Sequence, residues 1–321
     1  MPSSIPGLHH VTAIASDPQR NLDFYTEVIG LRLVKRTVNF DDPETYHFYF
    51  GNDTGTPGTI LTFFPWPGAN RGNPGTGETS ATAFRAPADS LEFWERRLLS
   101  FGIPAERAPE RFGEPVLRFA DPDGMRLEIV AQNHRGEFNV PRTSNVPAEH
   151  AIRGFHSVTL AQRVLEPTAK VLETMGYRKI AESENRTRFA ANGNAIGNYI
   201  DLLVQPQTAR GFLGAGSVHH IAFRADDDSA QLEWKDRLSE FPLHVTPVQD
   251  RIYFHSIYFR EPGGVLFEIA TDPPGFTLDE PVEALGESLK LPAWLESRRT
   301  HLERALPAIE LPHRRAEVSH E

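Results

Sequence analysis

The sequence predicts an α+β fold built from four consecutive βαβββ units, and three observations support this prediction. The first is internal repetition: residues 216–225 align with residues 77–86, and residues 261–269 align with residues 121–129, at offsets of 139 and 140. The second is a helical pattern that ends at a glycine or at a Phe-Pro pair in each repeat. The third is a closing turn followed by a strand, as in Asp-Pro-Asp-Gly at residues 121–124.

The first unit contains each element in order. A strand follows Gly7, and Asp17-Pro18 is typical of a helix start, because aspartate caps the first turn and proline fits its first position. Gly30 ends this helix, and residues 31–34 and 46–50 then show the extended and alternating patterns of strands. The apolar face of the predicted helix consists of Leu22, Tyr25, Val28 and Ile29.

The other three units follow the same plan and begin near Gly77, Gly154 and Gly216. Residues 7–12 align with residues 154–159, which indicates that the two halves of the chain are a duplication. Alternation over residues 251–255 predicts a strand in the fourth unit. The helices of these units are indicated by Leu91, Trp94 and Leu98 before Gly102, by Val171 and Leu172 before Gly176, and by Leu232, Trp234 and Leu238 before Phe241.

The length of 321 residues exceeds the roughly 250 to 300 residues at which one core usually splits, so two domains are expected. We place an N-terminal module at residues 1–135, a polar linker at residues 136–153 and a C-terminal module at residues 154–275. A C-terminal extension follows at residues 276–321. In this extension Trp294, Leu295 and Leu302 predict a short helix packed on the body, and the residues from Pro312 onward are expected to be disordered.

Composition narrows the class of function. The chain has 33 basic and 43 acidic residues, a net charge of −10, so binding to nucleic acid or to a membrane surface is not expected. It contains neither a long apolar run nor a signal-peptide pattern, which favours a cytoplasmic location. Cysteine is absent, so any metal ligands must be His, Asp or Glu. The expected partner is a small molecule, and the sequence leaves open whether the chain forms a homo-oligomer.

Corresponding positions of the four units can be compared for metal-binding side chains. The first strands carry His10, Ala81, Ser157 and His220, and the last strands carry Phe63, Glu128, Asp201 and Glu268. Two imidazoles and one carboxylate are the ligand set of many non-haem Fe(II) oxygenases, which makes His10, His220 and Glu268 the candidate ligands. For these three to meet, the first and fourth units must form one cup. The second and third units then form a vestigial cup, where Glu128 and Asp201 are expected to have a surface or capping role.

The repeated units and the candidate ligands resemble the vicinal-oxygen-chelate superfamily, which includes glyoxalase I, bleomycin-resistance proteins and extradiol dioxygenases. The resemblance covers residues 5 to about 275 and implies that both modules are cupped, partly open β-barrels. Several segments are more narrowly similar to the hydroquinone ring-cleaving dioxygenases typified by 2,6-dichlorohydroquinone 1,2-dioxygenase, namely residues 7–12, 34–37, 46–50, 55–59, 153–157, 219–220, 262–268 and 275–277.

This resemblance implies an Fe(II)-dependent ring-cleaving dioxygenase that uses O2 as co-substrate and acts on a substituted hydroquinone or related phenol. Mn(II) is the alternative metal. The metal would be held by His10, His220 and Glu268. Further residues implied at the site are Tyr258, His219 and Arg251 in catalysis, and Thr12, Arg251 and Tyr258 in substrate binding.

Strand geometry sets conditions on these further residues. Thr12 is two residues from His10 and should face the same cup, whereas His219 adjoins His220 and reaches the cup only through a bulge. Arg251 and Tyr258 can both reach the site only if residues near Arg251 leave the strand. His9 and His156 occupy equivalent places in units one and three, which favours a structural role for both. His255 is a candidate for tuning the pocket.

Two other classes of function are compatible with the same fold. A glyoxalase-type isomerase or lyase would need a fourth protein ligand to the metal and no O2, and Ala81, Ser157 and Phe63 at the corresponding positions argue against it. A different pairing of the cups would let Glu128 or Asp201 supply that ligand. A non-catalytic binding or resistance protein would not need two histidines and a glutamate to converge.

Overall fold

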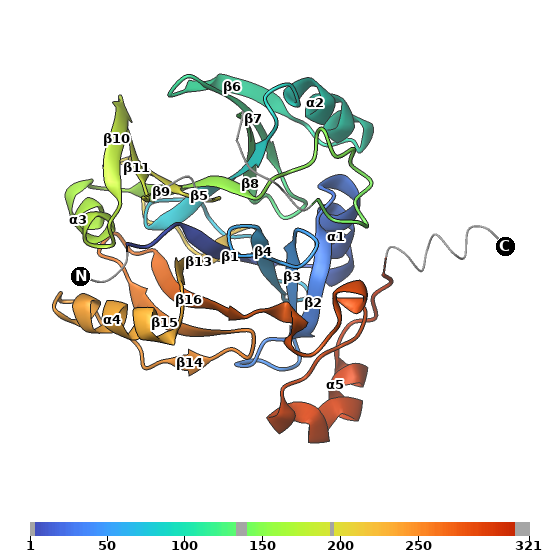
Figure 1. The fold of residues 1–321 in the computed structure, drawn as a ribbon. Helices are drawn as coiled ribbons and strands as arrows, with labels where there is room; N and C mark the ends of the chain where they lie inside the picture. Colours follow the sequence, from blue (N-terminus) through green and yellow to red (C-terminus); the bar gives the residue numbers. More distant parts are fainter. Residues whose placement is uncertain (1–3, 133–139, 193–195, 312–321) are drawn as a thin grey trace.

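The computed structural model describes residues 4–132, 140–192 and 196–311, and the strands of these segments form two eight-stranded sheets (Figure 1). The first sheet has the strand order β14-β15-β16-β13-β1-β4-β3-β2. It therefore joins the first and fourth units, as expected from the convergence of the candidate ligands. Its strands are β1 (Leu8–Ala15), β2 (Arg32–Val38), β3 (Tyr46–Gly51), β4 (Ile60–Pro65), β13 (Val218–Ala225), β14 (Gln249–Asp250), β15 (Phe254–Arg260) and β16 (Leu266–Pro274).

The second sheet has the order β10-β11-β12-β9-β5-β8-β7-β6 and joins the second and third units in the same way. In each sheet the first strands of two units pair antiparallel at the centre, β1 with β13 and β5 with β9. The strands of the second sheet are β5 (Glu78–Ala86), β6 (Glu106–Arg111), β7 (Glu114–Ala120), β8 (Arg126–Ala131), β9 (Phe155–Gln162), β10 (Arg178–Ser183), β11 (Arg186–Ala190) and β12 (Tyr199–Val204). Two curled sheets with few helices confirm the predicted fold class.

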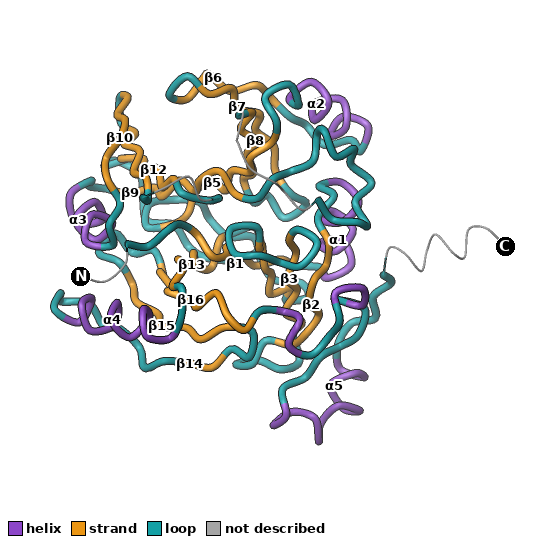
Figure 2. The backbone as a smooth tube through the Cα atoms, in the orientation of Figure 1, coloured by secondary structure: helices purple, strands orange, loops and turns teal. Residues whose placement is uncertain are grey.

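The four expected helices are present, and they flank the sheets as two pairs, α1 with α2 and α3 with α4, on opposite sides (Figures 1 and 2). Asp17 caps the first helix through its side chain, as its position before Pro18 indicates. In the fourth helix Leu232 is 49% exposed, and Gln231 is buried instead, because its amide donates to two backbone carbonyl groups. The helices are α1 (Pro18–Asp23), continued by a π-helical turn (Phe24–Val28), α2 (Leu91–Ser100), α3 (Glu166–Thr174) and α4 (Asp228–Ser239).

One face of each sheet contributes to a shared hydrophobic core. In β1, Val11 and Ala13 join this core, whereas His10 and Thr12 lie on the opposite face, as the two-residue period of a strand requires. The core also contains Val158 of β9, so the two sheets pack through their apolar faces. The opposite face of each sheet lines a cup, and polar side chains on that face are available for chemistry.

The C-terminal extension packs on the first sheet. It contains three 3-10 helices (Phe276–Leu278, Val282–Ala284 and Ala293–Arg298) and α5 (Arg299–Ala305). Leu295 and Leu302 are buried as predicted, whereas Trp294 is 56% exposed. The buried amine of Lys35 forms ion pairs with Asp279 and Glu280 and ties the extension to β2.

Two sequence-based expectations fall partly or wholly outside the described residues. The disorder expected from Pro312 onward is one of them, and the first four residues of the expected linker, 136–139, are the other. Residues 140–153 contain neither helix nor strand. Within the described segments, no helix combines the length and apolar character needed to cross a bilayer.

We expect Gly216→Ala to lower the free energy of unfolding more than Gly102→Ala. Both glycines have a positive φ, +83° and +71°, which costs an alanine about 1–2 kcal/mol. At Gly216 an added Cβ would also lie 2.3 Å from the carbonyl oxygen of Asp123, whereas at Gly102 it would meet no atom within 4 Å. Urea denaturation of both variants beside the unaltered chain tests this, and equal losses would contradict it.

Candidate metal centre

His10, His220 and Glu268 meet on the cup face of the first sheet, and all three are buried. The Nε2 atoms of the two histidines are 3.3 Å apart. Glu268 Oε2 lies 3.2 Å from the His10 Nε2 and 2.9 Å from the His220 Nε2. Within the described part of the chain, this is the one group of three or more His, Asp or Glu side chains whose ligand atoms lie close enough to share a metal ion.

Strand register explains how residues 210 positions apart come together. In the antiparallel pair of β1 and β13, Thr12 lies opposite His220 and His10 lies opposite Ala222, so the two histidines are diagonal neighbours on one face. Strand β16 then runs parallel to β13 and pairs Ala222 with Glu268. The carboxylate is thereby placed beside both imidazoles.

Each histidine ligand is preceded by a bulge. The register of β1 on β13 skips His9 at one end of the pairing and His219 at the other. A bulge leaves one extra residue opposite its partner strand and re-aims the side chain, so His219 lines the cup although it adjoins His220. The same skips occur at Ser80 and His156 in the second sheet, which confirms that His9 and His156 occupy equivalent places.

The bulge residues also touch the ligands. His9 Nδ1 lies 2.9 Å from His10 Nδ1, and His219 Nδ1 lies 2.8 Å from His220 Nδ1. One nitrogen of each pair donates to the other. With the donor on the ligand imidazole, the Nε2 of His10 and of His220 carries the lone pair that a metal requires.

The carboxylate is held in its ionised form. Burial raises the pKa of the Glu268 carboxyl, but the His10 and His220 imidazoles outweigh this effect and hold the pKa well below its usual range. The hydroxyl of Ser256 donates to Glu268 Oε1. The other oxygen, Oε2, accepts no hydrogen bond of good geometry from the described residues. A buried carboxylate oxygen that faces two imidazole nitrogens fits a divalent metal ion.

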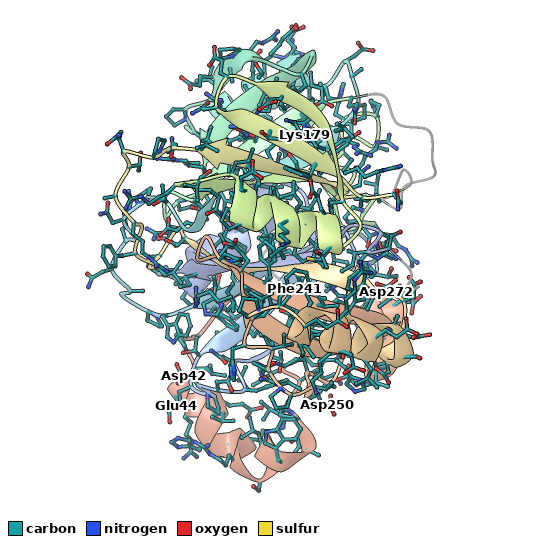
Figure 3. The ribbon with its side chains drawn as sticks, turned by 90° about the vertical axis from the view of Figure 1, so that its left-hand side faces the viewer. Asp42, Glu44, Lys179, Phe241, Asp250 and Asp272 are labelled. Carbon is teal, nitrogen blue, oxygen red and sulfur yellow. The ribbon has the colours of Figure 1, made fainter. Side chains whose placement is uncertain are left out.

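The cluster opens into a cavity of about 480 Å³, whose walls include the aromatic side chains of Phe40, Phe64, Trp66, Tyr49 and Phe254. Asp42 also lines it, and Figure 3 shows Asp42, Glu44 and Asp250 at the end of the molecule that carries the C-terminal extension. The metal cluster is thus open to a space suited to one substituted aromatic ring.

Arg251 and Tyr258 meet in this cavity. Arg251 Nε donates to the Tyr258 hydroxyl over 3.2 Å, and the guanidinium lies 5.4 Å from the centre of the same ring. Both residues reach the cup because the backbone leaves the strand between β14 and β15, where Ile252 has a φ of +72°. The continuous strand predicted over residues 251–255 is therefore wrong, and it begins at Phe254 instead.

Thr12 faces the cup side but is not among the residues that line the cavity. It is fully buried, and its hydroxyl accepts from Thr62 over 2.9 Å. Thr62 in turn contacts His47 Nε2 at 2.9 Å. These hydrogen bonds place Thr12 behind the cavity wall. There it can position His47 through Thr62, but it does not contact a molecule bound in the cavity.

His47 and Tyr49 line the cavity, and reasoning from the sequence missed them. The Tyr49 hydroxyl lies 2.9 Å from His47 Nδ1, so the two side chains form one polar unit in the wall. Burial lowers the pKa of the His47 imidazole well below its usual range, and electrostatic repulsion from His10 and His220 lowers it further. The alternation of residues 46–50 could have found both, since His47 and Tyr49 share the face opposite the core residues of that strand.

His255 does not line the cavity. Its Nδ1 lies 2.6 Å from Asp228 at the start of α4, and its side chain is 37% exposed. Strand register also corrects the comparison of the last strands of the four units, in which Phe63 stood for the first unit. Asp201 of the third unit pairs with Thr159, and the equivalent partner of Thr12 in the first unit is Thr62 and not Phe63. Phe63 belongs to the hydrophobic core.

In the second cup the buried carboxylates face arginines, which come from β6 and β11, instead of imidazoles. Arg111 donates to both oxygens of Glu128 at 2.6 and 2.7 Å, and Arg188 donates to both oxygens of Asp201 at 2.7 and 3.1 Å. Both carboxylates are buried, so the surface role considered for them was wrong. A guanidinium is a permanent cation without a lone pair, and it neutralises the carboxylate that a metal would need.

The fold and this site place the chain in a known family. The family model of the Glyoxalase/Bleomycin resistance protein/Dioxygenase superfamily matches residues 7–129 and 132–269, and the chain belongs to this superfamily. Among its relatives is a Bacillus subtilis (strain 168) protein named "Putative ring-cleaving dioxygenase MhqO", which is 49% identical over 306 residues, covering 95% of this chain and 97% of the relative.

A second relative is the chlorohydroquinone/hydroquinone 1,2-dioxygenase of Sphingobium indicum. It is 36% identical over 315 residues, which cover 95% of this chain and 97% of the relative. A crystal structure from Bacillus subtilis, 49% identical in sequence, superposes with a TM-score of 0.92 and covers 96% of this chain and 99% of its own. The similarity thus extends through both sheets.

We expect Glu114→Gln to destabilise the chain at pH 7 by about 2–3 kcal/mol. Burial raises the pKa of Glu114, but His156 and Arg188 outweigh this and lower it to about 2. A carboxylate with a depressed pKa contributes stability above its unfolded pKa of about 4.3, and that contribution is lost as the pH falls towards 2.

The difference in unfolding free energy between the unaltered chain and Glu114→Gln should therefore shrink between pH 4.5 and the acid limit. Denaturant titrations at several pH values measure it. Glu110→Gln, an exposed position on β6 with the same change of charge, is the matched control and should change stability by less than about 0.5 kcal/mol. A difference for Glu114→Gln that does not vary with pH would contradict the assignment.

Proposed function

We propose that this protein is an Fe(II)-dependent ring-cleaving dioxygenase that acts on a substituted hydroquinone or related phenol, with Mn(II) as the alternative metal. The observation that carries the proposal is the convergence of His10, His220 and Glu268 at the base of an aromatic-lined cavity. The relative named chlorohydroquinone/hydroquinone 1,2-dioxygenase supports the substrate class. Fe(II) bound by this ligand set supplies open coordination positions and the redox chemistry through which O2 reacts with an electron-rich ring.

The protein's own residues would orient the ring and manage protons. Burial, and then the negative charge of Glu268, raise the pKa of the Tyr258 hydroxyl, so this group keeps its proton at neutral pH and acts as a donor. Arg251 next to it is permanently charged and would stabilise the negative charge that develops as the acidic product forms. Together they suit the second hydroxyl of a hydroquinone.

His219 is less suited to carrying protons than the sequence suggested. Burial, and then the neighbouring His220, lower the pKa of the His219 imidazole to about 3, so it is neutral at physiological pH. Its Nδ1 is engaged by His220. We therefore assign it to orienting the ligand imidazole, whose Nδ1–H it accepts, and to donating a hydrogen bond from its own Nε2–H.

A glyoxalase-type isomerase or lyase is less well supported. That chemistry was expected to require a fourth protein ligand, and the cluster in the described residues contains three. Burying two imidazoles and a carboxylate together costs free energy, and a purely non-catalytic binding protein would have no use for such a group at the base of the cavity.

We expect His10→Ala, His220→Ala and Glu268→Ala each to abolish retention of Fe(II), whereas Glu128→Ala retains it. The first three remove a ligand atom, and Glu128 lies in the other cup. Iron content after anaerobic loading and desalting measures this. If Glu128→Ala fails to fold because Arg111 is left unpaired, the conservative Glu128→Gln serves in its place. Equal metal loss in a folded Glu128 variant would contradict the pairing of the units at the metal centre.

We expect oxygen uptake by the Fe(II)-loaded protein with substituted hydroquinones, and none by His10→Ala. Tyr258→Phe should retain iron but lower kcat by about 10²–10⁴-fold, because it removes a proton donor without removing a ligand. An oxygen electrode with a panel of hydroquinones and catechols measures these rates. Iron-loaded protein that consumes no oxygen with any of them would overturn the dioxygenase proposal and favour the isomerase or lyase class.

A further inference from the structure

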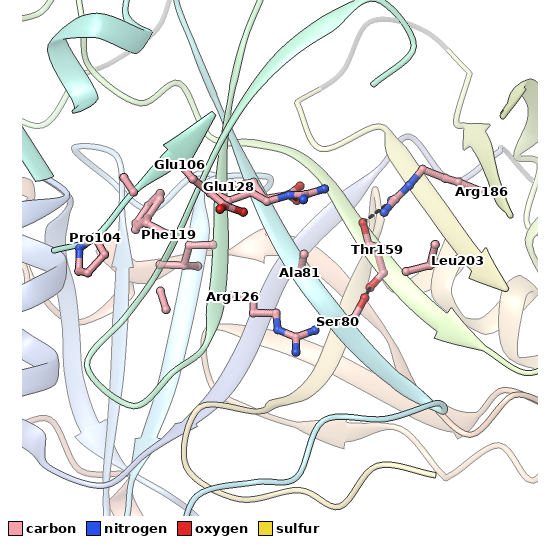
Figure 4. A pocket seen from close by; sticks show the side chains of 14 residues that line it. Ser80, Ala81, Pro104, Glu106, Phe119, Arg126, Glu128, Thr159, Arg186 and Leu203 are labelled. Carbon is pink, nitrogen blue, oxygen red and sulfur yellow. Dashed lines mark hydrogen bonds and ion pairs between the residues drawn. The ribbon is translucent and has the colours of Figure 1, made fainter. Parts of the chain in front are cut away.

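The second cup contains a cavity of its own, of about 730 Å³ (Figure 4). It lies on the sheet formed by units two and three and is separate from the metal centre. Its lining carries no histidine, and the arginines of this cup already neutralise the carboxylates that a metal would need. Metal-dependent chemistry is therefore not what this cavity offers.

Three guanidinium groups line the cavity and keep unused donors. Arg126 donates no hydrogen bond within the described part of the chain, although it lies near the carboxylate of Glu78. Toward the other residues that the structure describes, Arg186 donates only through Nη1, to Thr159 and Asp201, and Arg118 only through Nε, to Glu128. The remaining N–H groups of these three side chains are free to bind an anion.

The negative charge in the lining is smaller than the positive charge. Two carboxylates, Glu106 and Glu128, line the cavity beside the three arginines. Three guanidinium groups and two carboxylates give the lining a net charge of +1. The balance favours a ligand with a single negative charge.

The two ends of the cavity differ in polarity. Figure 4 shows Pro104 and Phe119 at one end, and Ser80, Thr159 and Arg186 at the other. The side chains of Ala105 and Leu127 extend the apolar part of the lining. A ligand that matches both ends has an anionic group on an apolar body.

From this arrangement we propose that the second cup binds a small organic monocarboxylate with an apolar body. The carboxylate lies against the guanidinium groups of Arg126 and Arg186, and the body lies against Pro104 and Phe119. A planar carboxylate matches the paired N–H groups of a guanidinium, which a neutral amide of the same shape does not.

Isothermal titration of the full chain with benzoate, hexanoate, benzamide and inorganic phosphate tests the proposal. We expect benzoate or hexanoate to bind with one site in the second cup, and the two probes distinguish an aromatic from an aliphatic body. Benzamide, the neutral counterpart of benzoate, should bind at least about 10-fold more weakly, because the charge-assisted hydrogen bonds are lost. Phosphate, which has no apolar body, should bind weakly as well.

Two variants locate the binding site. Arg126→Gln should weaken carboxylate binding about 10-fold or more, and Ala120→Trp should abolish it by filling the cavity from an exposed position at the end of β7. Arg96→Gln on α2, an exposed arginine outside the cavity, is the matched control for charge and should bind as the unaltered chain does. Neither variant touches the metal centre, so oxygen uptake should be unchanged in both.

Three outcomes would overturn the proposal. The first is no heat of binding for either carboxylate up to about 10 mM, a concentration that should saturate a ligand of this size in a matching pocket. The second is binding that survives both Arg126→Gln and Ala120→Trp, which would place the carboxylate elsewhere. The third is phosphate binding as tight as benzoate binding, which would show a plain anion site without a role for the apolar end.

Discussion

The antiparallel pairing of β1 with β13 is the interaction on which the metal centre depends. It joins the first and the fourth unit and sets the diagonal relation of His10 to His220. The parallel neighbour β16 then adds Glu268 in register. The bulges at the two ends of this pairing each insert an extra histidine beside a ligand. A one-residue slip of β13 would turn both its ligand and its core residues to the wrong faces, so the shared hydrophobic core also fixes the geometry of the site.

The two cups show how one scaffold supports different chemistry. Both have bulges at equivalent positions, and both bury a carboxylate on the last strand of a unit. The difference lies in the groups that face that carboxylate. Imidazoles are neutral and offer lone pairs, so the carboxylate and the rings can share a metal ion. Guanidinium groups are cationic donors, so they form closed ion pairs and leave a cavity whose remaining donors suit an anion.

The sequence predicted those features that repetition makes visible. The four units, the pairing of the first with the fourth, and the convergence of the three ligands all follow from comparing equivalent positions. Three details did not follow. Thr62 takes the place assigned to Phe63, because the parallel pairing of β1 with β4 sets Thr62 opposite Thr12. Gln231 replaces Leu232 in the interior, because two carbonyl groups on neighbouring strands satisfy its amide. Arg111 and Arg188 come from strands whose neighbours become known only once the sheet is assembled.

The pairing of the first unit with the last has a consequence for biosynthesis. Strands β1 to β4 leave the ribosome before any other strand, and β1 can pair with β4 at once, yet its other partner, β13, begins at Val218, after the whole second sheet has been made. Until then β1 is an edge strand of the nascent chain, and the side that will face β13 is unpaired. The second sheet can close while translation continues, whereas the first sheet cannot close until β16 has emerged. A chain interrupted between β13 and β16 would hold both imidazoles and lack the carboxylate, so the ligand set is complete only when synthesis is nearly complete.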